Sequence, residues 1–180
     1  AHKSADYLKL NPNGLIPVLE DGDLVLYETL AIGLHLCDRH PQAGLMPPVG
    51  SDARAQAYKW LVWMTNTLQA MLIHHFYPER MVDAGNTEGA AQVKAHATAR
   101  VIGLLQQLDD QLASHGQPWL LGADYSLADI FGFMLCRWTR GFPERPARSF
   151  AHLGPWLQRV LARPAVQRAI AAERLQPPWV

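Results

Sequence analysis

The sequence predicts a small α/β unit followed by an all-helical domain, and three observations carry this prediction. Two short apolar runs, LIPVLE and LVLY, flank Asp21-Gly22, and an Asp-Gly pair favours a two-residue hairpin turn. The stretch QAGLMPPVGS is rich in glycine and proline and indicates a linker. After it, apolar residues recur at the helical spacing of three and four. We therefore expect an N-terminal unit at 1–41, a linker at 42–51 and a helical domain at 52–180.

The N-terminal unit is expected to contain four elements in order. A short helical turn is predicted at 4–10, and the turn residues NPNG follow it. The hairpin comes next. A helix then begins near Glu28 and Thr29 and continues to about Arg39, where Pro41 stops it.

Three long amphipathic helices and two shorter ones are expected in the second domain. Each long helix shows one apolar face, and the two short ones run from Phe150 to Leu161 and from Pro164 to about Glu173. The apolar positions of the long helices are Leu61, Met64, Leu68 and Leu72; Val93, Ala97, Val101, Leu104, Leu108 and Leu112; and Leu127, Ile130, Phe131, Met134, Leu135 and Trp138.

The third long helix has a clear start signal. Ser126 is placed to be its N-cap, and Asp129 lies three residues further on, as in a capping box with aspartate in place of glutamate. This pattern accounts for both residues, so a structural role is favoured over a catalytic one.

Composition excludes several classes of function. The formal net charge is zero and no basic block is present, which argues against nucleic acid as a partner. No apolar run approaches the roughly 20 residues that a membrane span needs. Cys37 and Cys136 are far apart, which predicts two free thiols and a reducing, cytoplasmic environment. Neither cysteine is expected to be a nucleophile, and the eight histidines form no strong metal motif, so we expect no metal.

The stretch NPNGLIPVLEDGDLVLYETLAIGLHLCDRHP, followed by a helical domain with YSLADI, resembles the glutathione S-transferase superfamily, bacterial type. Either motif alone is weak, but their order with a linker between them is specific. The resemblance implies a thioredoxin-like N-terminal domain, of which this sequence carries the C-terminal half, followed by a helical bundle. It also implies that the family's first strand, first helix and second strand are missing from the sequence. The family's catalytic Tyr, Ser or Cys lies in that segment, so no catalytic residue is assigned.

The resemblance implies a glutathione-binding role for five residues. The proline that matches Pro17 is cis in the family and frees the backbone of the preceding residue, here Ile16, to pair with the cysteinyl part of glutathione. Without the resemblance, Pro17 reads as an ordinary proline at a strand start. Glu28 and Thr29 match the family's Glu-Ser and would hold the ammonium and carboxylate of the γ-glutamyl group. The alternative is that Thr29 only caps the helix. Lys3 matches a basic residue near the glycine carboxylate.

A pocket for the second substrate is expected among aromatic residues of the helical domain. Trp63, His74, Tyr77 and Trp138 are its candidates, although aromatic residues at helical spacing more often belong to the core. Adjacent residues on a helix diverge by about 100°, so at most one of His74 and His75 can face the cleft. A packing or surface role is favoured for both.

Two hypotheses of different class follow. The first is a homodimeric, cytoplasmic glutathione transferase that joins the glutathione thiolate to a small apolar electrophile. The second is a transferase-like binding or scaffold protein without catalysis. An isomerase, dehalogenase or glutathione-dependent reductase of the same superfamily also remains open.

Overall fold

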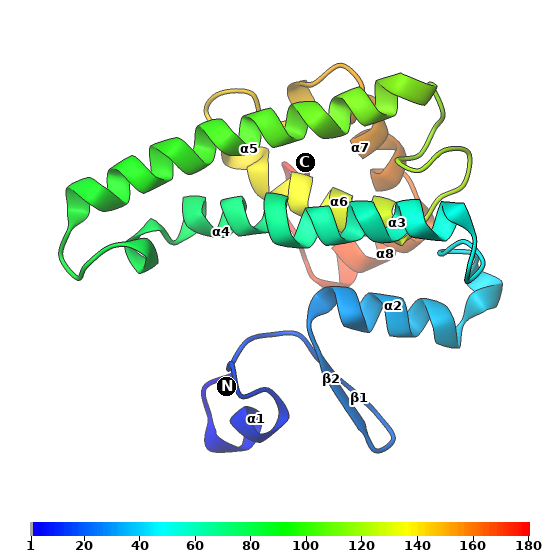
Figure 1. The fold of residues 1–180 in the computed structure, drawn as a ribbon, viewed down its shortest axis with the longest axis horizontal. Helices are drawn as coiled ribbons and strands as arrows, with labels where there is room; N and C mark the ends of the chain where they lie inside the picture. The colour runs from blue at the N-terminus through cyan, green and yellow to red at the C-terminus, as the bar shows by residue number, and fades with distance from the viewer. Residues whose placement is uncertain (1) are drawn as a thin grey trace.

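The computed structural model describes residues 2–180 and consists of a small unit and a larger helical domain (Figure 1). This architecture confirms the predicted class, an α/β unit followed by an all-helical domain. The strands are β1 (Val18–Asp21) and β2 (Leu24–Tyr27), and the helices are α1 (Ala5–Leu10), α2 (Thr29–Arg39), α3 (Asp52–Trp63), α4 (Ala70–Phe76), α5 (Thr87–His115), α6 (Leu127–Trp138), α7 (Leu153–Leu161) and α8 (Pro164–Ala172). Short 3₁₀ turns are present at Pro41–Ala43, Pro78–Met81, Thr139–Gly141 and Ala147–Ser149.

The hairpin is antiparallel, and its turn lies one residue later than the sequence predicted. Asp21 pairs with Leu24, so the two loop residues are Gly22 and Asp23 rather than Asp21 and Gly22. Gly22 has a φ of 61°, a left-handed value that glycine adopts without steric cost. Glycine at the first loop position therefore determines where the chain reverses.

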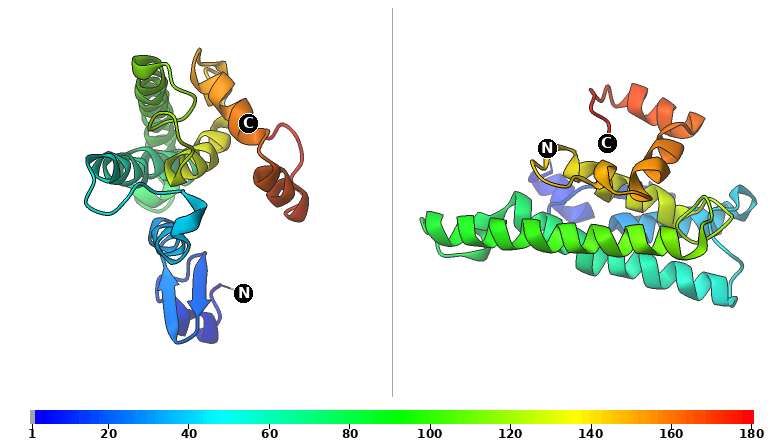
Figure 2. Two further views of the ribbon diagram at one scale, coloured as in Figure 1. Left: turned by 90° about the vertical axis from the view of Figure 1, so that its right-hand side faces the viewer. Right: turned by 90° about the horizontal axis from the view of Figure 1, so that it is seen from above.

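The second domain is built around two long helical elements. One is α5, and the other is a rod made of α3, a π-helical segment and α4. α3 and α4 are joined by a π-helical segment, Met64–Gln69, where the sequence predicted one uninterrupted helix. The rod lies alongside α5 over much of its length (Figures 1 and 2). The predicted apolar positions of the rod all have no exposed surface: Leu61, Met64, Leu68 and Leu72.

α6 lies at the centre of the domain and contacts the rod, α7 and the small unit. Gly132 lets the helices approach closely, because a Cβ there would lie 3.2 Å from both Met64 Cε and Trp156 Cη2. Gly33 does the same for α2, where a Cβ would lie 3.1 Å from Leu127 Cδ1. The small unit is therefore seated on α6 through a glycine contact.

A buried carboxylate holds the start of α6 in place. Asp129 has no exposed surface, and its Oδ2 accepts hydrogen bonds from Ser126 N at 2.9 Å and Ser126 Oγ at 3.0 Å, the capping arrangement that the sequence indicates. Its Oδ1 accepts from Leu120 N and Trp156 Nε1, both at 2.8 Å. Asp129 thus joins α6 to α7 and to the preceding loop, which the sequence pattern did not predict.

Candidate functional site

The open end of the hairpin brings together four of the five residues assigned to glutathione. Val18 pairs with Tyr27, so Pro17 and Glu28 are the next residues out on the two strands. Ile16–Pro17 and Glu28–Thr29 therefore both lie at the open end of the hairpin, directly beyond its last pair. The Ile16–Pro17 peptide bond is cis, the isomer that the resemblance implied. Within residues 2–180 the backbone of Ile16 makes no hydrogen bond, and the residue is 75% exposed.

The loop before Pro17 is fixed by side chains that the sequence reasoning missed. Asn11 is buried, accepts from Asn13 N at 3.0 Å and donates to the Leu15 carbonyl at 2.7 Å. The Tyr7 hydroxyl donates to the same carbonyl at 2.8 Å. Two donors on one carbonyl orient the peptide that leads into Ile16. The dense turn sequence NPNG was the only signal for this arrangement.

Lys3 lies against the same loop. Its ammonium donates to the Asn13 carbonyl at 3.3 Å, and its side chain crosses Gly14, where a Cβ would lie 2.8 Å from Lys3 Nζ. Gly14 has a φ of 59° and leaves room for this side chain. The positive charge is therefore held beside the loop that precedes Pro17.

Glu28, not Thr29, is the N-cap of α2, so the interpretation of Thr29 as the capping residue is wrong. Thr29 is the first helical residue, and within the described chain no side chain caps this helix. Glu28 has a φ of 76° and a ψ of 113°, a conformation that residues other than glycine rarely adopt. The free N–H groups and the positive end of the helix dipole favour a bound carboxylate. The exposed Glu28 carboxylate beside them favours an ammonium, so the two charges of an α-amino acid group are both matched.

Two of the four candidates for the second-substrate pocket line one cavity. Tyr77 and Trp138 bound a pocket of about 250 Å³ together with Ile73, Phe76 and Arg140. It lies where the C-terminal ends of α4 and α6 meet. Trp63 and His74 are not among the lining residues, and Trp63 instead packs edge to face on Trp60, with ring centroids 5.3 Å apart.

His75 is a packing residue. Its Nδ1 lies 2.8 Å from Thr98 Oγ1, and its ring centroid lies 4.4 Å from that of Phe142. Thr98 already donates its hydroxyl proton to the Lys94 carbonyl, so His75 must donate through Nδ1. Burial, and then the charge of Lys94, lower the pKa of His75 below its ordinary value.

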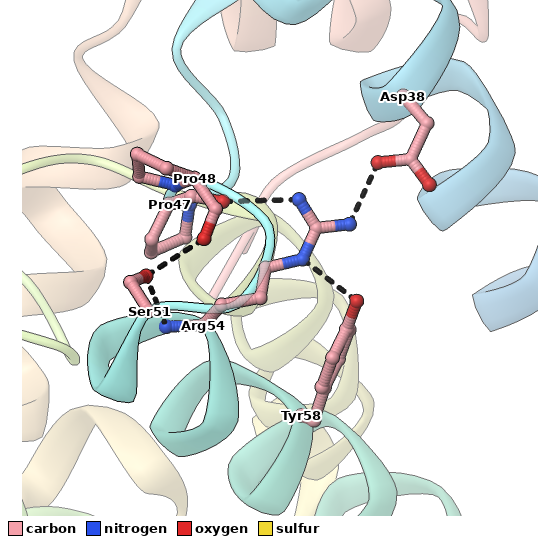
Figure 3. Close-up of polar contacts among 6 residues, drawn as sticks. All are labelled: Asp38, Pro47, Pro48, Ser51, Arg54 and Tyr58. Carbon is pink, nitrogen blue, oxygen red and sulfur yellow. Dashed lines mark hydrogen bonds and ion pairs between the residues drawn. The ribbon is translucent and has the colours of Figure 1, made fainter.

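A buried arginine clamps the linker between the two parts of the chain (Figure 3). Arg54 is 5% exposed, and its Nη2 lies 2.6 Å from Asp38 Oδ1 in α2. Nη1 donates to the Pro47 carbonyl at 3.0 Å and Nε to the Tyr58 hydroxyl at 2.8 Å. The end of α2, the linker and α3 therefore converge on one guanidinium.

A second, larger cavity of about 1080 Å³ lies beside this clamp. It is bounded by the linker, by the loop before α6 and by Arg163. None of Lys3, Ile16, Pro17 and Glu28 lines it. This cavity is therefore separate from the hairpin site.

The two cysteines are free and buried, as predicted. Burial raises the pKa of Cys136 to about 12, and burial followed by the charge of Asp38 raises the pKa of Cys37. Both thiols therefore stay protonated near neutral pH and are poor nucleophiles. Among residues 2–180, no three His, Cys, Asp or Glu side chains are grouped so as to hold a metal ion. No helix in the same range combines the length and apolar character that crossing a membrane requires.

Comparisons with known proteins match both parts of the chain. The model of the glutathione S-transferase C-terminal domain matches residues 45–164, and that of the N-terminal domain matches residues 1–39. Glutathione S-transferase 3 of Zea mays is 35% identical over 191 aligned positions, which cover 99% of this chain and 80% of the maize protein.

Solved structures of bacterial proteins show the same fold. A sphingomonad glutathione S-transferase complexed with glutathione is 30% identical, with a TM-score of 0.79, covering 95% of this chain and 80% of that one. The glutathione S-transferase of Xylella fastidiosa is 28% identical, with a TM-score of 0.86, covering 97% and 83%. The chain therefore belongs to the glutathione S-transferase family.

Proposed function

We propose that this chain binds glutathione at the open end of the hairpin and transfers its thiolate to a small electrophile. The observation that supports the proposal is the strand register, in which Val18 pairs with Tyr27. This register brings Ile16, whose backbone makes no hydrogen bond within residues 2–180, to the same end of the hairpin as Glu28 and Thr29, where a helix starts beside a carboxylate. The glutathione bound in the sphingomonad relative supports the same ligand.

Each residue has a distinct task in this proposal. Ile16 pairs with the cysteinyl backbone through its N–H and C=O groups, and Pro17 fixes the direction of that peptide. Thr29 and the first N–H groups of α2 hold the γ-glutamyl carboxylate, while Glu28 holds the neighbouring ammonium. Lys3 attracts the glycine carboxylate from the loop side.

The reaction needs the thiolate form of glutathione. The thiol gives up its proton, the sulfur forms a bond with the electrophilic carbon, and the leaving group departs with the electron pair of the broken bond. An ordinary thiol has a pKa near 8.5, so a positioned hydrogen-bond donor is required to raise the thiolate fraction at neutral pH. The residues that we assign bind and orient the substrate. The pocket formed by Tyr77 and Trp138 receives the electrophile.

Calorimetric titration with glutathione and with the dipeptide Cys-Gly tests the binding proposal. Cys-Gly lacks the γ-glutamyl group, so it cannot use Glu28 and Thr29, and we expect it to bind about tenfold more weakly. Thr29→Val removes the hydroxyl at nearly constant volume and should weaken glutathione binding but not Cys-Gly binding. Equal affinity for the two ligands would contradict the assignment.

Turnover distinguishes the enzyme from the scaffold. With glutathione and 1-chloro-2,4-dinitrobenzene, an active transferase releases chloride and forms the aryl thioether at a rate above the uncatalysed reaction. Glutathione binding without that rate increase would support the scaffold hypothesis instead.

We also propose that the protein is a homodimer and that it is located in the reducing environment of the cytoplasm. Tyr58 and Val62 lie one helical turn apart on α3 and are 41% and 50% exposed, which supports an association surface there. The two free, buried thiols support the compartment. Sedimentation of the wild type and of Val62→Glu tests the dimer, because a charge at a buried interface should shift the protein to the monomer.

A further inference from the structure

The pocket at the ends of α4 and α6 combines aromatic walls with positive charge. Phe76, Tyr77 and Trp138 provide three aromatic side chains, and the ring centroids of Phe76 and Trp138 lie 6.2 Å apart. The half-buried Arg140 also lines the pocket, and its lining residues include no carboxylate. A neutral apolar ligand would make no use of this guanidinium.

Arg140 and its neighbour Arg137 are two cations without an anionic partner. Among residues 2–180, no ion pair within 4.0 Å involves either side chain. Arg140 Nη1 donates to the Arg137 carbonyl at 3.1 Å, and among residues 2–180 its other N–H groups make no hydrogen bond and can bind a ligand. One turn away, Arg137 Nε is buried and has no hydrogen-bond partner within residues 2–180, which is a costly arrangement.

The positive charges of the Arg137 and Arg140 guanidinium groups repel each other. The pKa of Arg137 is lowered, first by burial and then by the positive charge of Arg140. A third cation is close, because the Arg80 guanidinium lies 3.9 Å from the ring centroid of Tyr77. An anion at this pocket would relieve the repulsion and gain charge-assisted hydrogen bonds.

We infer that the electrophile carried by this pocket is a single-ring aromatic molecule with a carboxylate, and that Arg140 is the residue that selects the negative charge. The inference rests on the proposed function and specifies its substrate class. The size agrees, because a cavity of about 150 Å³ holds benzene, whereas drug-sized ligands need about 300 Å³ or more. The pocket volume of about 250 Å³ lies between these limits.

The binding experiment uses a matched pair of ligands, 4-nitrobenzoate and the neutral isostere 4-nitrobenzamide, titrated calorimetrically into the full chain at neutral pH. A charge-assisted hydrogen bond at a half-buried site should make the benzoate bind about tenfold more tightly. In Arg140→Gln the two affinities should come within about twofold, and Arg140→Lys should keep part of the preference. Arg100→Gln on the exposed face of α5 removes the same charge away from the pocket and should keep all of it.

Three results would overturn the inference: equal binding of the two ligands to the wild type, no binding of either, or an undiminished preference in Arg140→Gln. Far-UV circular dichroism checks that each variant is folded, and Arg140→Lys serves as a second test should Arg140→Gln unfold. Glutathione is titrated into the same samples. Failure of glutathione to bind while the Arg140-dependent preference persists would refute the proposed function and leave the anion site standing.

Turnover gives a second readout where the chain is active. We expect kcat/KM to be about tenfold higher for 4-chloro-3-nitrobenzoate than for 4-chloro-3-nitrobenzamide, relative to their uncatalysed rates. The difference should lie mainly in KM, because Arg140 binds the carboxylate in the ground state and in the transition state alike. Arg140→Gln should remove this difference, whereas Arg100→Gln, away from the pocket, should keep it.

Discussion

Glu28 offers a test that separates backbone strain from ligand binding. Its φ of 76° and ψ of 113° lie in a region that costs a residue other than glycine about 1–3 kcal/mol. Glu28→Gly removes this cost, while the greater backbone freedom of glycine in the unfolded chain takes back about 0.5–1 kcal/mol. We therefore expect Glu28→Gly to raise the free energy of unfolding by roughly 1 kcal/mol. Glu28→Gln keeps the strain and should change it by less than about 0.5 kcal/mol.

Glutathione affinity should respond differently. A contact between an exposed carboxylate and a ligand ammonium is worth up to about 1 kcal/mol, or roughly fivefold in the dissociation constant. Both Glu28→Gly and Glu28→Gln remove this charge, so both should bind glutathione about fivefold more weakly. The two variants thus share a binding defect and differ in stability.

Urea denaturation followed by circular dichroism measures stability, and calorimetry measures affinity. Glu20→Gln is the matched control, since it removes one exposed carboxylate from β1 at a distance from the open end of the hairpin, and should leave both quantities unchanged. A loss of stability above about 1 kcal/mol in Glu28→Gly would refute the strain argument. Unchanged affinity in Glu28→Gln would refute the role of the carboxylate.

Three further predictions concern the scaffold and are measured by urea denaturation. Asp129→Ala leaves three buried N–H donors unpaired, at about 1–3 kcal/mol each, and should lower the free energy of unfolding by at least about 3 kcal/mol. Asp129→Asn keeps one acceptor oxygen and should lower it by less. Equal losses in the two variants would contradict the hydrogen-bond assignment. Arg54→Met keeps the apolar stem but loses the ion pair with Asp38, whose side chain is 55% exposed. The free energy of unfolding should therefore fall by only about 1 kcal/mol. A loss above about 3 kcal/mol would instead indicate a buried charge left without its partner. The lowered pKa of His75 means that the unfolded state takes up its proton first, so the wild type should lose stability as pH falls through about 6.5. His75→Gln lacks this titration and should lose less stability than the wild type between pH 8 and 5.5. Parallel stability profiles of the two proteins over this pH range would argue against the lowered pKa.

The sequence predicted what depends on local chemistry. Helical periodicity located the three long helices, and the Ser-x-x-Asp pattern located the start of α6. It did not predict the partners that residues acquire across the fold. Arg54 and Asp38 are separated by 16 residues, and Asp129 and Trp156 by 27, and no local pattern marks either pair.

Residues that depend on neither periodicity nor a motif were also missed. Asn11 lies in a turn where most asparagines are exposed, yet it is 3% exposed because it fastens the loop before Pro17. The π-helical segment within the rod is invisible to the apolar pattern, since the buried side of the rod continues through it. Arg140 lines a pocket only because α4 and α6, which are far apart in the sequence, end at the same place.

The position of the hairpin turn decides which residues meet at the candidate binding site. With Asp21 and Gly22 as the two loop residues, Glu20 would pair with Asp23, and Pro17 would lie opposite Leu26. The observed turn at Gly22 and Asp23 pairs Asp21 with Leu24, and this register places Pro17 opposite Glu28. A shift of one residue in the turn moves the register by two, because both strands change together. Glycine at the first loop position favours the observed turn, because glycine adopts a φ of 61° at lower cost than aspartate does. One small residue at the far end of the hairpin therefore sets which side chains meet at its open end.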